Sequence, residues 1–418
     1  MDTRYLIIGG GMAADAAVKA IRRADPEGNI VLVSEERHPP YKRPPLSKGL
    51  WKGDDEAKID LKTAAAATRL LLGKRATRLD LADRRVALDD GTSIAFERLL
   101  LATGARARPL PGLPDSPRVV AYRTLDDYRH VRELARPGAK AVVIGGGFIG
   151  SEIAAALRLA GIEVAMVFPE AAIGSGRFPD GLARAVTQDY QGRGVRVLAG
   201  RTVASAEERD DSSVVLTLDD GSELVADLVV VGVGTVPNDE LARDAGLATD
   251  RGVLVDATLR AQRLGGGEAV PVYAAGDVAS FAWPGLERRM RIEHEDNAYS
   301  MGAAAGRAMA LSLAQERGLA GAAGPRHHDH LPFFYSDLFD AGYEAVGLLD
   351  TRLDLVEDWR VPGREGVVYY LEDGRVRGVL LWNTWGQVDA ARELVLGGQA
   401  HAPEDLLGRL PTDDHHDP

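Results

Sequence analysis

The chain has 418 residues, of which 45% are hydrophobic and 27% are charged, and its formal net charge is −12. This acidic balance argues against a nucleic-acid-binding protein, because phosphate binding needs a concentrated surface of lysine and arginine. The absence of cysteine excludes disulfides, thiolate metal sites and a redox-active dithiol. No apolar run approaches the ~18 residues that span a bilayer, and a strand begins close to Met1, so we expect a cytoplasmic chain without a membrane span.

The first element in chain order is an apolar strand that ends in a glycine-rich turn, Gly9-Gly10-Gly11-Met12-Ala13-Ala14. The first glycine allows a tight passage from strand to helix, and the next lets backbone N–H groups approach a pyrophosphate at the helix N-terminus. Glu35 closes the following strand, where a carboxylate can accept hydrogen bonds from ribose hydroxyls. This turn predicts a dinucleotide site.

Shorter elements complete this first nucleotide domain. A hairpin over 85–96 turns at Asp89-Asp90-Gly91, and a buried strand over 98–104 runs into a Thr-Gly turn. Four proline and glycine residues between 109 and 114 then mark a boundary, where we expect the chain to leave the domain.

The same pattern repeats in the next part of the chain. A helix is expected over 124–136, and a second apolar strand ends in Gly145-Gly146-Gly147-Phe148-Ile149-Gly150. Glu170 closes the next strand, and its charge would repel a 2′-phosphate, which favours NADH over NADPH. A hairpin around 214–221 and a buried strand over 228–234 follow. Two copies of the turn predict two dinucleotides.

The remaining elements predict a return to the first domain and then a third domain. A strand over 272–277 that ends on Gly-Asp, with a helix beginning after it, suits such a return, as does a helix near 294–316 with a small-residue face at 303–306. His327–His330 could form a metal cluster, but neighbouring histidines of a strand face opposite sides and no second ligand group is evident, so the segment is interpreted as a polar linker. Beyond 331 the chain is aromatic and β-rich, with a hairpin over 366–382 and a helix near 387–396.

The order of these motifs, with Ala-Thr-Gly at 102–104 and Ala-Gly-Asp at 275–277, resembles the two-dinucleotide flavoprotein family of glutathione-reductase type. Disulfide reductases of that family carry a cysteine pair where this chain has Pro40–Lys48, which resembles instead the cysteine-free branch of ferredoxin reductases and apoptosis-inducing factor. The segments 147–152, 168–170, 291–294, 342–348 and 381–383 look closest to apoptosis-inducing factor of a bacterial type.

This resemblance implies an α/β fold with two Rossmann-like dinucleotide-binding domains and a C-terminal α+β domain. It implies FAD as the first cofactor and NADH as the second. The expected division is a discontinuous FAD-binding domain over 1–115 and 246–328, a NAD-binding domain over 116–245 and a C-terminal domain over 329–418.

The resemblance also implies the residues of the site. Lys48 and Glu152 would form an ion pair beside the reactive edge of the flavin, and Phe148 would cover the flavin face and give way to nicotinamide; with His294, these are the catalytic candidates. From the residues alone, Phe148 could instead be a core residue at a helix start, and Lys48 could be a solvent-exposed lysine. No metal site is expected. The other positions that match cofactor contacts are Gly9, Gly11, Met12, Ala13, Ala14, Glu35, Glu36, Arg43, Ala76, Arg108, Gly145, Gly146, Gly147, Ile149, Gly150, Glu170, Gly234, Gly276, Asp277, Glu293, Glu295, Tyr335, Glu344 and Asn383.

The function implied is an FAD-dependent NADH oxidoreductase that forms a stable reduced flavin–NAD charge-transfer complex and passes electrons to a quinone-like, ferredoxin or dye-like acceptor. One alternative is an NADH-dependent ferredoxin or rubredoxin reductase, which the charge of −12 disfavours because its partner would be acidic. Another is an NADH-sensing partner protein that forms a homodimer when NADH binds.

Overall fold

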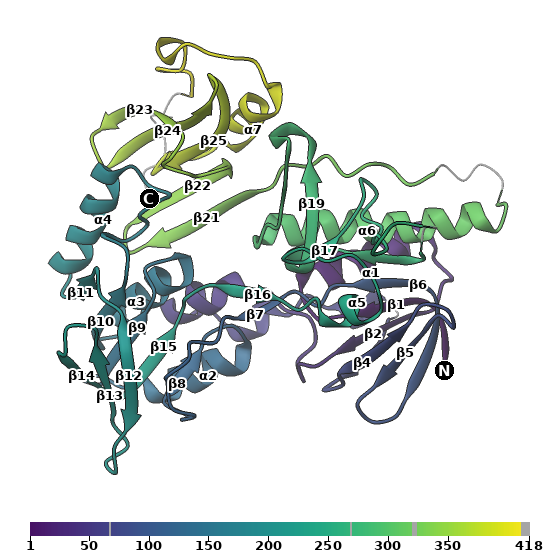
Figure 1. Cartoon of the computed structure of the whole chain (residues 1–418), viewed down its shortest axis with the longest axis horizontal. Coiled ribbons are helices and arrows are strands. Elements are labelled where there is room, and N and C mark those ends of the chain that lie inside the picture. Colours follow the sequence, from purple (N-terminus) through teal and green to yellow (C-terminus); the bar gives the residue numbers. More distant parts are fainter. Residues whose placement is uncertain (67, 268–269, 320–323, 411–418) are drawn as a thin grey trace. The chain divides into compact units, whose positions relative to one another are not determined.

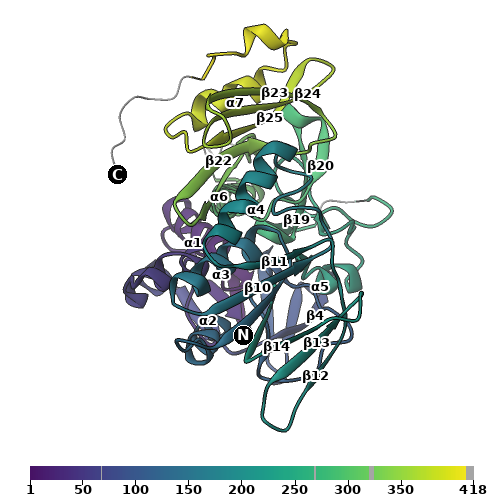
Figure 2. The same ribbon diagram turned by 90° about the vertical axis from the view of Figure 1, so that its left-hand side faces the viewer.

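The structure is a computed structural model that describes residues 1–66, 68–267, 270–319 and 324–410 (Figures 1 and 2). Two compact units divide the chain. Unit 1 comprises Met1–Arg43, Glu56–Arg106 and Val236–Pro332, and unit 2 comprises Pro44–Asp55, Ala107–Thr235 and Phe333–Pro418. The short strands β7 (Ala105–Ala107) and β16 (Thr235–Pro237) lie where the chain passes between them. The three-domain division given above remains a prediction.

Unit 1 is built on a seven-stranded sheet with the order β3-β2-β1-β6-β5-β4, in which β18 also pairs with β6. The strands β3, β2, β1, β6 and β18 run parallel, and β5 and β4 continue the sheet as an antiparallel hairpin. The strand β5 also pairs antiparallel with the start of β6, which confirms the predicted hairpin over 85–96. The strands are β1 (Asp2–Ile8), β2 (Ile30–Ser34), β3 (Thr68–Leu72), β4 (Ala76–Asp80), β5 (Arg85–Leu88), β6 (Ser93–Leu101) and β18 (Val272–Ala274).

Two helices of unit 1 pack very closely. A Cβ atom built on Gly302 of α6 (Glu295–Glu316) would lie 2.2 Å from the carbonyl oxygen of Ala13 in α1 (Met12–Ala24), and one on Gly306 would lie 2.5 Å from that of Ala17. Only glycine allows this approach. The predicted helix near 294–316 is confirmed, and its closest face is formed by Gly302 and Gly306.

One element of unit 1 differs from the prediction. Residues 276–278 form a single 3₁₀ turn, and the chain then enters β19 (Ala279–Trp283) where a helix was expected. This apolar segment forms a strand because β19 pairs with β17 (Val253–Leu254) and β20 (Arg288–Met290). The short helix α5 (Glu240–Asp244) precedes this small sheet in the sequence.

Unit 2 repeats the strand–turn–helix arrangement on a five-stranded parallel sheet with the order β11-β10-β9-β15-β8. A three-stranded antiparallel sheet, β12-β13-β14, shares an apolar core with it that includes Val142, Leu216 and Val229. The elements are β8 (Val119–Ala121), α2 (Leu125–Leu134), β9 (Lys140–Ile144), α3 (Phe148–Leu159), β10 (Glu163–Phe168), α4 (Asp180–Gly192), β11 (Arg196–Ala199), β12 (Val203–Glu208), β13 (Val214–Leu218), β14 (Glu223–Ala226) and β15 (Leu228–Val231).

The C-terminal part of unit 2 is a five-stranded antiparallel sheet with the order β21-β22-β25-β24-β23. Its predicted hairpin turns at Asp373 and Gly374, which both have positive φ, as a two-residue turn of this kind requires. The elements are β21 (Phe333–Leu338), β22 (Ala341–Gly347), β23 (Asp354–Val361), β24 (Glu365–Glu372), β25 (Arg375–Trp382) and α7 (Val388–Gly397).

The predicted fold class is confirmed, with two glycine-turn α/β sheets and a C-terminal α+β part. In the part of the chain that the structure describes, no helix combines the length and the apolar character that crossing a membrane requires.

Candidate functional site

The first glycine turn lies between β1 and α1 in unit 1. Gly9 has φ +120°, and a Cβ atom there would lie 2.0 Å from the carbonyl oxygen of Ala102. Gly11 is the N-cap of α1; no side chain caps this end, and a Cβ atom on Gly11 would meet nothing within 4 Å. The N-terminus of α1 thus has no capping side chain, which is typical of a helix N-terminus that binds an anion.

Other predicted residues of unit 1 lie beside this turn. Gly276 has φ +74°, and its Cβ position is 3.0 Å from Cβ of Ala13, so the turn that carries Asp277 borders α1. Arg291 donates to the carbonyl oxygen of Asp277 at 2.9 Å and forms an ion pair with Glu293. His294 is the N-cap of α6, and Glu295 is its first residue. The structure thus brings the segments 276–277 and 291–295 together.

The two glutamates that follow β2, Glu35 and Glu36, have different surroundings. Glu35 is exposed, whereas Glu36 accepts from Arg43 and, at 2.5 Å, from the hydroxyl of Tyr41. Burial works against the charge of Arg43, but Glu36, Tyr41 and Asp277 together keep the pKa of its guanidinium above the ordinary value. Glu35 is therefore the carboxylate of this pair that is available to a ribose. Ala76 lies at the start of β4.

The second glycine turn lies between β9 and α3 in unit 2 and has the same backbone. Gly145 also has φ +120°, and a Cβ atom on Gly150 would lie 2.1 Å from the carbonyl oxygen of Gly145. Gly147 caps α3 without a side-chain hydrogen bond. Gly146 fits against the ring of Phe168, where a Cβ atom would come within 2.8 Å. The N-terminus of α3 thus also has no capping side chain, but Nη1 of Arg177 lies 3.9 Å from the Cβ position of Gly147.

Four predicted positions border the sheet of unit 2. Glu170 is exposed after β10, and Ile149 is 37% exposed in the first turn of α3. The backbone N–H of Arg108 donates to the carbonyl oxygen of Gly234 at 2.9 Å, and the exposed guanidinium bonds to that of Thr235 at 3.2 Å. Arg108 therefore lies along the strand that leaves unit 2.

Glu152 is the centre of a buried polar cluster. Its side chain is 6% exposed, and its two oxygens accept from the hydroxyls of Ser47 at 2.5 Å and Ser336 at 2.6 Å. Nζ of Lys48 lies 2.9 Å from the same carboxylate. The predicted Lys48–Glu152 ion pair is thus present in the structure, whereas the two serines were not predicted.

The Lys48 ammonium keeps hydrogen-bonding capacity. Although it is close to Glu152, its geometry is not that of a hydrogen bond, so Nζ is buried without a hydrogen-bond acceptor among the described residues. It also lies 4.4 Å from the ring centroid of Tyr335. A buried ammonium with free N–H groups fits a site that is completed by a bound acceptor, such as a flavin ring.

The backbone around Lys48 is fixed by aromatic side chains of unit 2. The carbonyl oxygen of Leu46 accepts from the indole N–H of Trp51 at 2.9 Å and from the hydroxyl of Tyr122. The carbonyl oxygen of Leu50 accepts from Tyr128 at 3.2 Å. These bonds explain why the segment 44–55 belongs to unit 2, although it interrupts two stretches of unit 1.

Phe148 begins α3 and lies in a group of rings. It makes edge contacts with Phe334 at 5.8 Å and lies 6.4 Å from Tyr343, between ring centroids. The guanidinium of Arg177 lies 4.5 Å from its ring centroid. A small hollow beside the second turn is lined by Gly146, Gly147, Phe148, Ser151, Ile173, Gly174, Arg177, Phe178, Leu338 and Tyr343. Sequence reasoning missed Arg177, which belongs to no recognisable motif.

The remaining predicted residues of unit 2 lie on the C-terminal sheet. Tyr335 and Glu344 are opposite each other on β21 and β22, and burial raises the pKa of Glu344. The side-chain amide of Asn383 is used within the protein, because it accepts from the N–H of Gly342 and donates to the carbonyl oxygen of Arg364, both at 2.7 Å. The roles of these residues toward a cofactor remain predictions.

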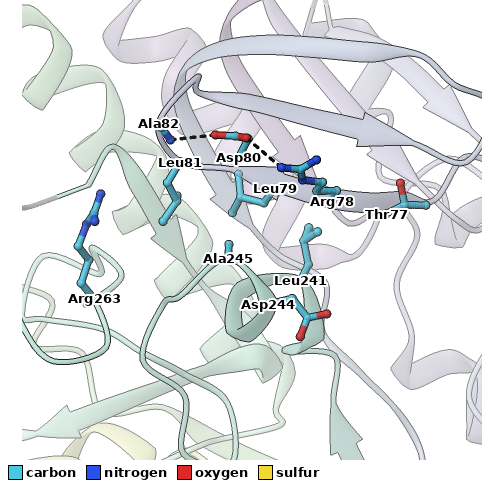
Figure 3. A pocket seen from close by; sticks show the side chains of 10 residues that line it. All are labelled: Thr77, Arg78, Leu79, Asp80, Leu81, Ala82, Leu241, Asp244, Ala245 and Arg263. Carbon is cyan, nitrogen blue, oxygen red and sulfur yellow. Dashed lines mark hydrogen bonds and ion pairs between the residues drawn. The ribbon is translucent and has the colours of Figure 1, made fainter.

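A second hollow contains none of the predicted residues (Figure 3). It lies in unit 1 and is lined by Thr77, Arg78, Leu79, Asp80, Leu81, Ala82, Leu241, Asp244, Ala245 and Arg263. Of its two acidic residues, Asp80 accepts hydrogen bonds from the N–H of Ala82 at 3.0 Å and from Arg78 at 3.3 Å. Among the described residues, no group of three or more acidic, histidine or cysteine side chains is arranged to hold a metal ion.

The histidine segment before β21 is partly different from the polar linker that was predicted. His328 is only 5% exposed and packs against the rings of Phe281 and Trp283 at 5.4 and 5.7 Å between centroids. Its backbone N–H donates to the carbonyl oxygen of Ala257 at 2.7 Å. The alternation rule for strands does not apply, because residues 324–332 have no strand structure.

Comparisons with known proteins agree with this geometry. A family model described as pyridine nucleotide-disulphide oxidoreductase matches residues 3–302. The mitochondrial apoptosis-inducing factor 1 of Dictyostelium discoideum is 31% identical over 455 residues, covering 99% of this chain and 82% of the relative. The ferredoxin–NAD(+) reductase component of the anthranilate 1,2-dioxygenase system of Burkholderia cepacia is 33% identical over 410 residues, covering 96% of each chain.

A solved structure of putidaredoxin reductase, in a covalent complex with putidaredoxin, is also similar. Its TM-score is 0.84 at 29% identity, and the match covers 99% of this chain and 96% of the other. These findings confirm the resemblance inferred from the sequence. The chain belongs to the pyridine nucleotide-disulphide oxidoreductase family and is an FAD-dependent, NAD(H)-linked oxidoreductase.

Proposed function

We propose that FAD binds at the first glycine turn, that NADH binds at the second, and that the Lys48–Glu152 cluster supports hydride transfer between them. The observation that carries this proposal is the buried Lys48 ammonium, which has a paired carboxylate but no hydrogen-bond acceptor. When bound, FAD supplies the ring that accepts a hydride, two electrons and one proton, from the nicotinamide of NADH. The residues of the chain would bind and orient the two cofactors and would exclude water from the reacting atoms.

Lys48 would stabilise the negative charge that the reaction places near it. Its N–H groups are free to donate, and burial strengthens an electrostatic interaction compared with that in water. Glu152 holds the ammonium in place while Ser47 and Ser336 hold both carboxylate oxygens. Lys48 is thus oriented before any ligand binds, so that little reorganisation is needed during the reaction.

Phe148 would keep water from the hydride-accepting face until nicotinamide arrives. Its position at the first residue of α3 links it directly to the turn at which we place the nucleotide. Exposed Glu170 would bind the adenosine ribose and exclude a 2′-phosphate, which gives a preference for NADH.

An anaerobic titration of the flavin-loaded protein with NADH tests the proposal. Bleaching of the flavin at one NADH per flavin is expected, and a broad long-wavelength band that survives admission of air would establish the long-lived complex between reduced flavin and NAD⁺. Absence of bleaching, with flavin bound, would overturn the proposal.

We infer two candidate acceptors. A ferredoxin-type iron–sulfur protein is favoured by the dioxygenase-system relative, which this chain matches over 96% of both sequences. A slow quinone-like or dye-like acceptor is the alternative that the resemblance found in the sequence implies. Stopped-flow measurement of the rates at which a ferredoxin and a quinone reoxidise the reduced flavin distinguishes the two candidate acceptors.

We further propose a cytoplasmic location and a homodimer that depends on NADH. Light scattering of the oxidised and NADH-reduced protein tests the dimer, and an unchanged mass would overturn it.

A further inference from the structure

Arg177 has an unusual partner for a guanidinium. Its charged group lies 4.5 Å from the ring centroid of Phe148, and within the described ranges no carboxylate pairs with it. Other arginines of unit 2 form ion pairs, as Arg193 does with Asp189 and Asp340. The aromatic face is a weaker partner for a guanidinium than an anion is, so Arg177 is ready to exchange it.

An anion is expected within reach of this group. A Cβ atom on Gly147 would lie 3.9 Å from Nη1 of Arg177, and Gly147 is the N-cap of α3. This is the helix N-terminus at which we place the pyrophosphate of NADH. The same guanidinium is therefore close both to the ring of Phe148 and to the proposed phosphate position.

The backbone of Arg177 is held, so only its side chain is free to move. Its carbonyl oxygen accepts from the hydroxyl of Tyr370, and that of Gly176 accepts from the N–H of Thr351 at 3.1 Å. The next residue, Phe178, is buried at 5.4 Å from both Tyr343 and Trp382, between ring centroids.

We propose that Arg177 acts as a clasp: its guanidinium contacts the ring of Phe148 and holds that ring in the closed position until a nucleotide phosphate binds the guanidinium instead. This inference rests on the proposed roles of Phe148 and of the second turn. Arg177 is accordingly a positioning residue. Arrival of the phosphate end of NADH would release the ring, which then gives way to the nicotinamide end of the same molecule. A hydride donor without phosphate would have to displace Phe148 against the clasp.

The test compares two hydride donors on flavin-loaded protein by anaerobic stopped flow. NADH carries the pyrophosphate, whereas 1-benzyl-1,4-dihydronicotinamide carries none. We expect Arg177→Met to slow flavin reduction by limiting NADH about tenfold, through loss of a charge-assisted hydrogen bond. We expect the same variant to speed reduction by the benzyl compound roughly threefold, through loss of the cation–π contact.

If Arg177 acts as a clasp, Arg177→Met slows flavin reduction by NADH and speeds flavin reduction by the benzyl compound. A slower reaction with both donors would show general damage, and a slower reaction with NADH alone would show a phosphate ligand without a clasp; either result overturns the proposal, as does no change with either donor. Arg193→Met is the matched control, because Arg193 lies 4.7 Å from the ring centroid of Phe339 in the same unit, and both rates should be unchanged.

A Phe148→Ala variant separates this inference from the proposed function. It should react rapidly with the benzyl compound, and adding Arg177→Met to it should give no further gain. If Phe148→Ala leaves that rate unchanged, the covering role of Phe148 fails. If wild-type protein is not reduced by NADH, the proposed function fails first.

Discussion

At the scale of single residues, the Glu152 cluster predicts an asymmetry between its two charges. Glu152→Gln leaves the Lys48 ammonium buried without a counter-charge, and we expect the free energy of unfolding to fall by about 3 kcal/mol. Lys48→Met leaves Glu152 with its two serine donors, so the loss should be smaller, about 1 kcal/mol. Urea unfolding of the flavin-loaded variants measures both.

The exposed pair Lys74–Asp90 provides the control for this comparison, since Asp90→Asn should leave stability unchanged within error. Equal losses for Glu152→Gln and Lys48→Met would contradict the proposed geometry. The ion pair itself could be predicted through resemblance, but its two serines could not. Ser336 is 184 residues from Glu152, and a single hydroxyl side chain leaves no pattern in a sequence.

His328 predicts a dependence of stability on pH. Burial lowers its pKa from 6.5 to about 4, with His330 and Arg307 acting in the same sense and Asp329 and Asp296 opposing them. The unfolded chain therefore binds a proton that the folded protein does not, and the stability present above pH 6.5 should fall as the pH drops from 6.5 toward 4. The full loss would be about 3 kcal/mol.

Urea unfolding across this range, compared with His328→Phe, measures that contribution. The variant should retain packing against Phe281 and Trp283 and show a flatter profile. His130→Gln is the control, because His130 lies in unit 2 and is not among the groups that shift the pKa of His328, so its profile should follow that of the wild type. Parallel profiles for wild type and His328→Phe would refute the assignment.

At the scale of elements, the contact between α1 and α6 depends on two glycines. A Cβ atom on Gly306 would lie 2.5 Å from the backbone oxygen of Ala17, which no side-chain rotation can relieve. We expect Gly306→Ala to cost about 2 kcal/mol of stability and to weaken flavin binding, because α1 carries the first turn at its N-terminus. Thermal unfolding and the flavin dissociation constant measure the two effects.

Gly181 of α4 is the matched helical control. A Cβ atom there meets nothing within 4 Å, so Gly181→Ala should be neutral or stabilising by up to about 1 kcal/mol. A destabilisation equal to that of Gly306→Ala would contradict the role of close packing.

The elements themselves could be predicted well where periodicity and turn residues agree. The glycine turns and the hairpin over 366–382 both combine a strong apolar pattern with a residue that ends it. The strand β19 could not be predicted, because its partners β17 and β20 are set by the tertiary structure. The small-residue face of α6 was expected at 303–306, but α6 comes nearest to α1 at Gly302 and Gly306. This contact also depends on the tertiary structure.

At the scale of the whole molecule, each unit gathers three separate stretches of chain around one glycine turn. The number of nucleotide sites could be predicted from the sequence, because each site is encoded in a contiguous strand–turn–helix segment. The membership of the segment 44–55 in unit 2 could not, because it depends on bonds from Tyr122 and Tyr128 to backbone carbonyl oxygens.

This organisation predicts that the two ligands protect different turns. Amide hydrogen exchange should slow at 9–15 when FAD is restored to flavin-free protein, because the first-turn N–H groups of α1 gain a phosphate acceptor. NAD⁺ should slow exchange at 145–151 in both forms of the protein, since the open N-terminus of α3 belongs to the other unit. The strands β4 and β5, which carry no glycine turn, serve as the internal control. Protection at 145–151 by FAD alone would reverse the assignment of the two turns. Protection of neither turn by either ligand would remove them from the binding site altogether.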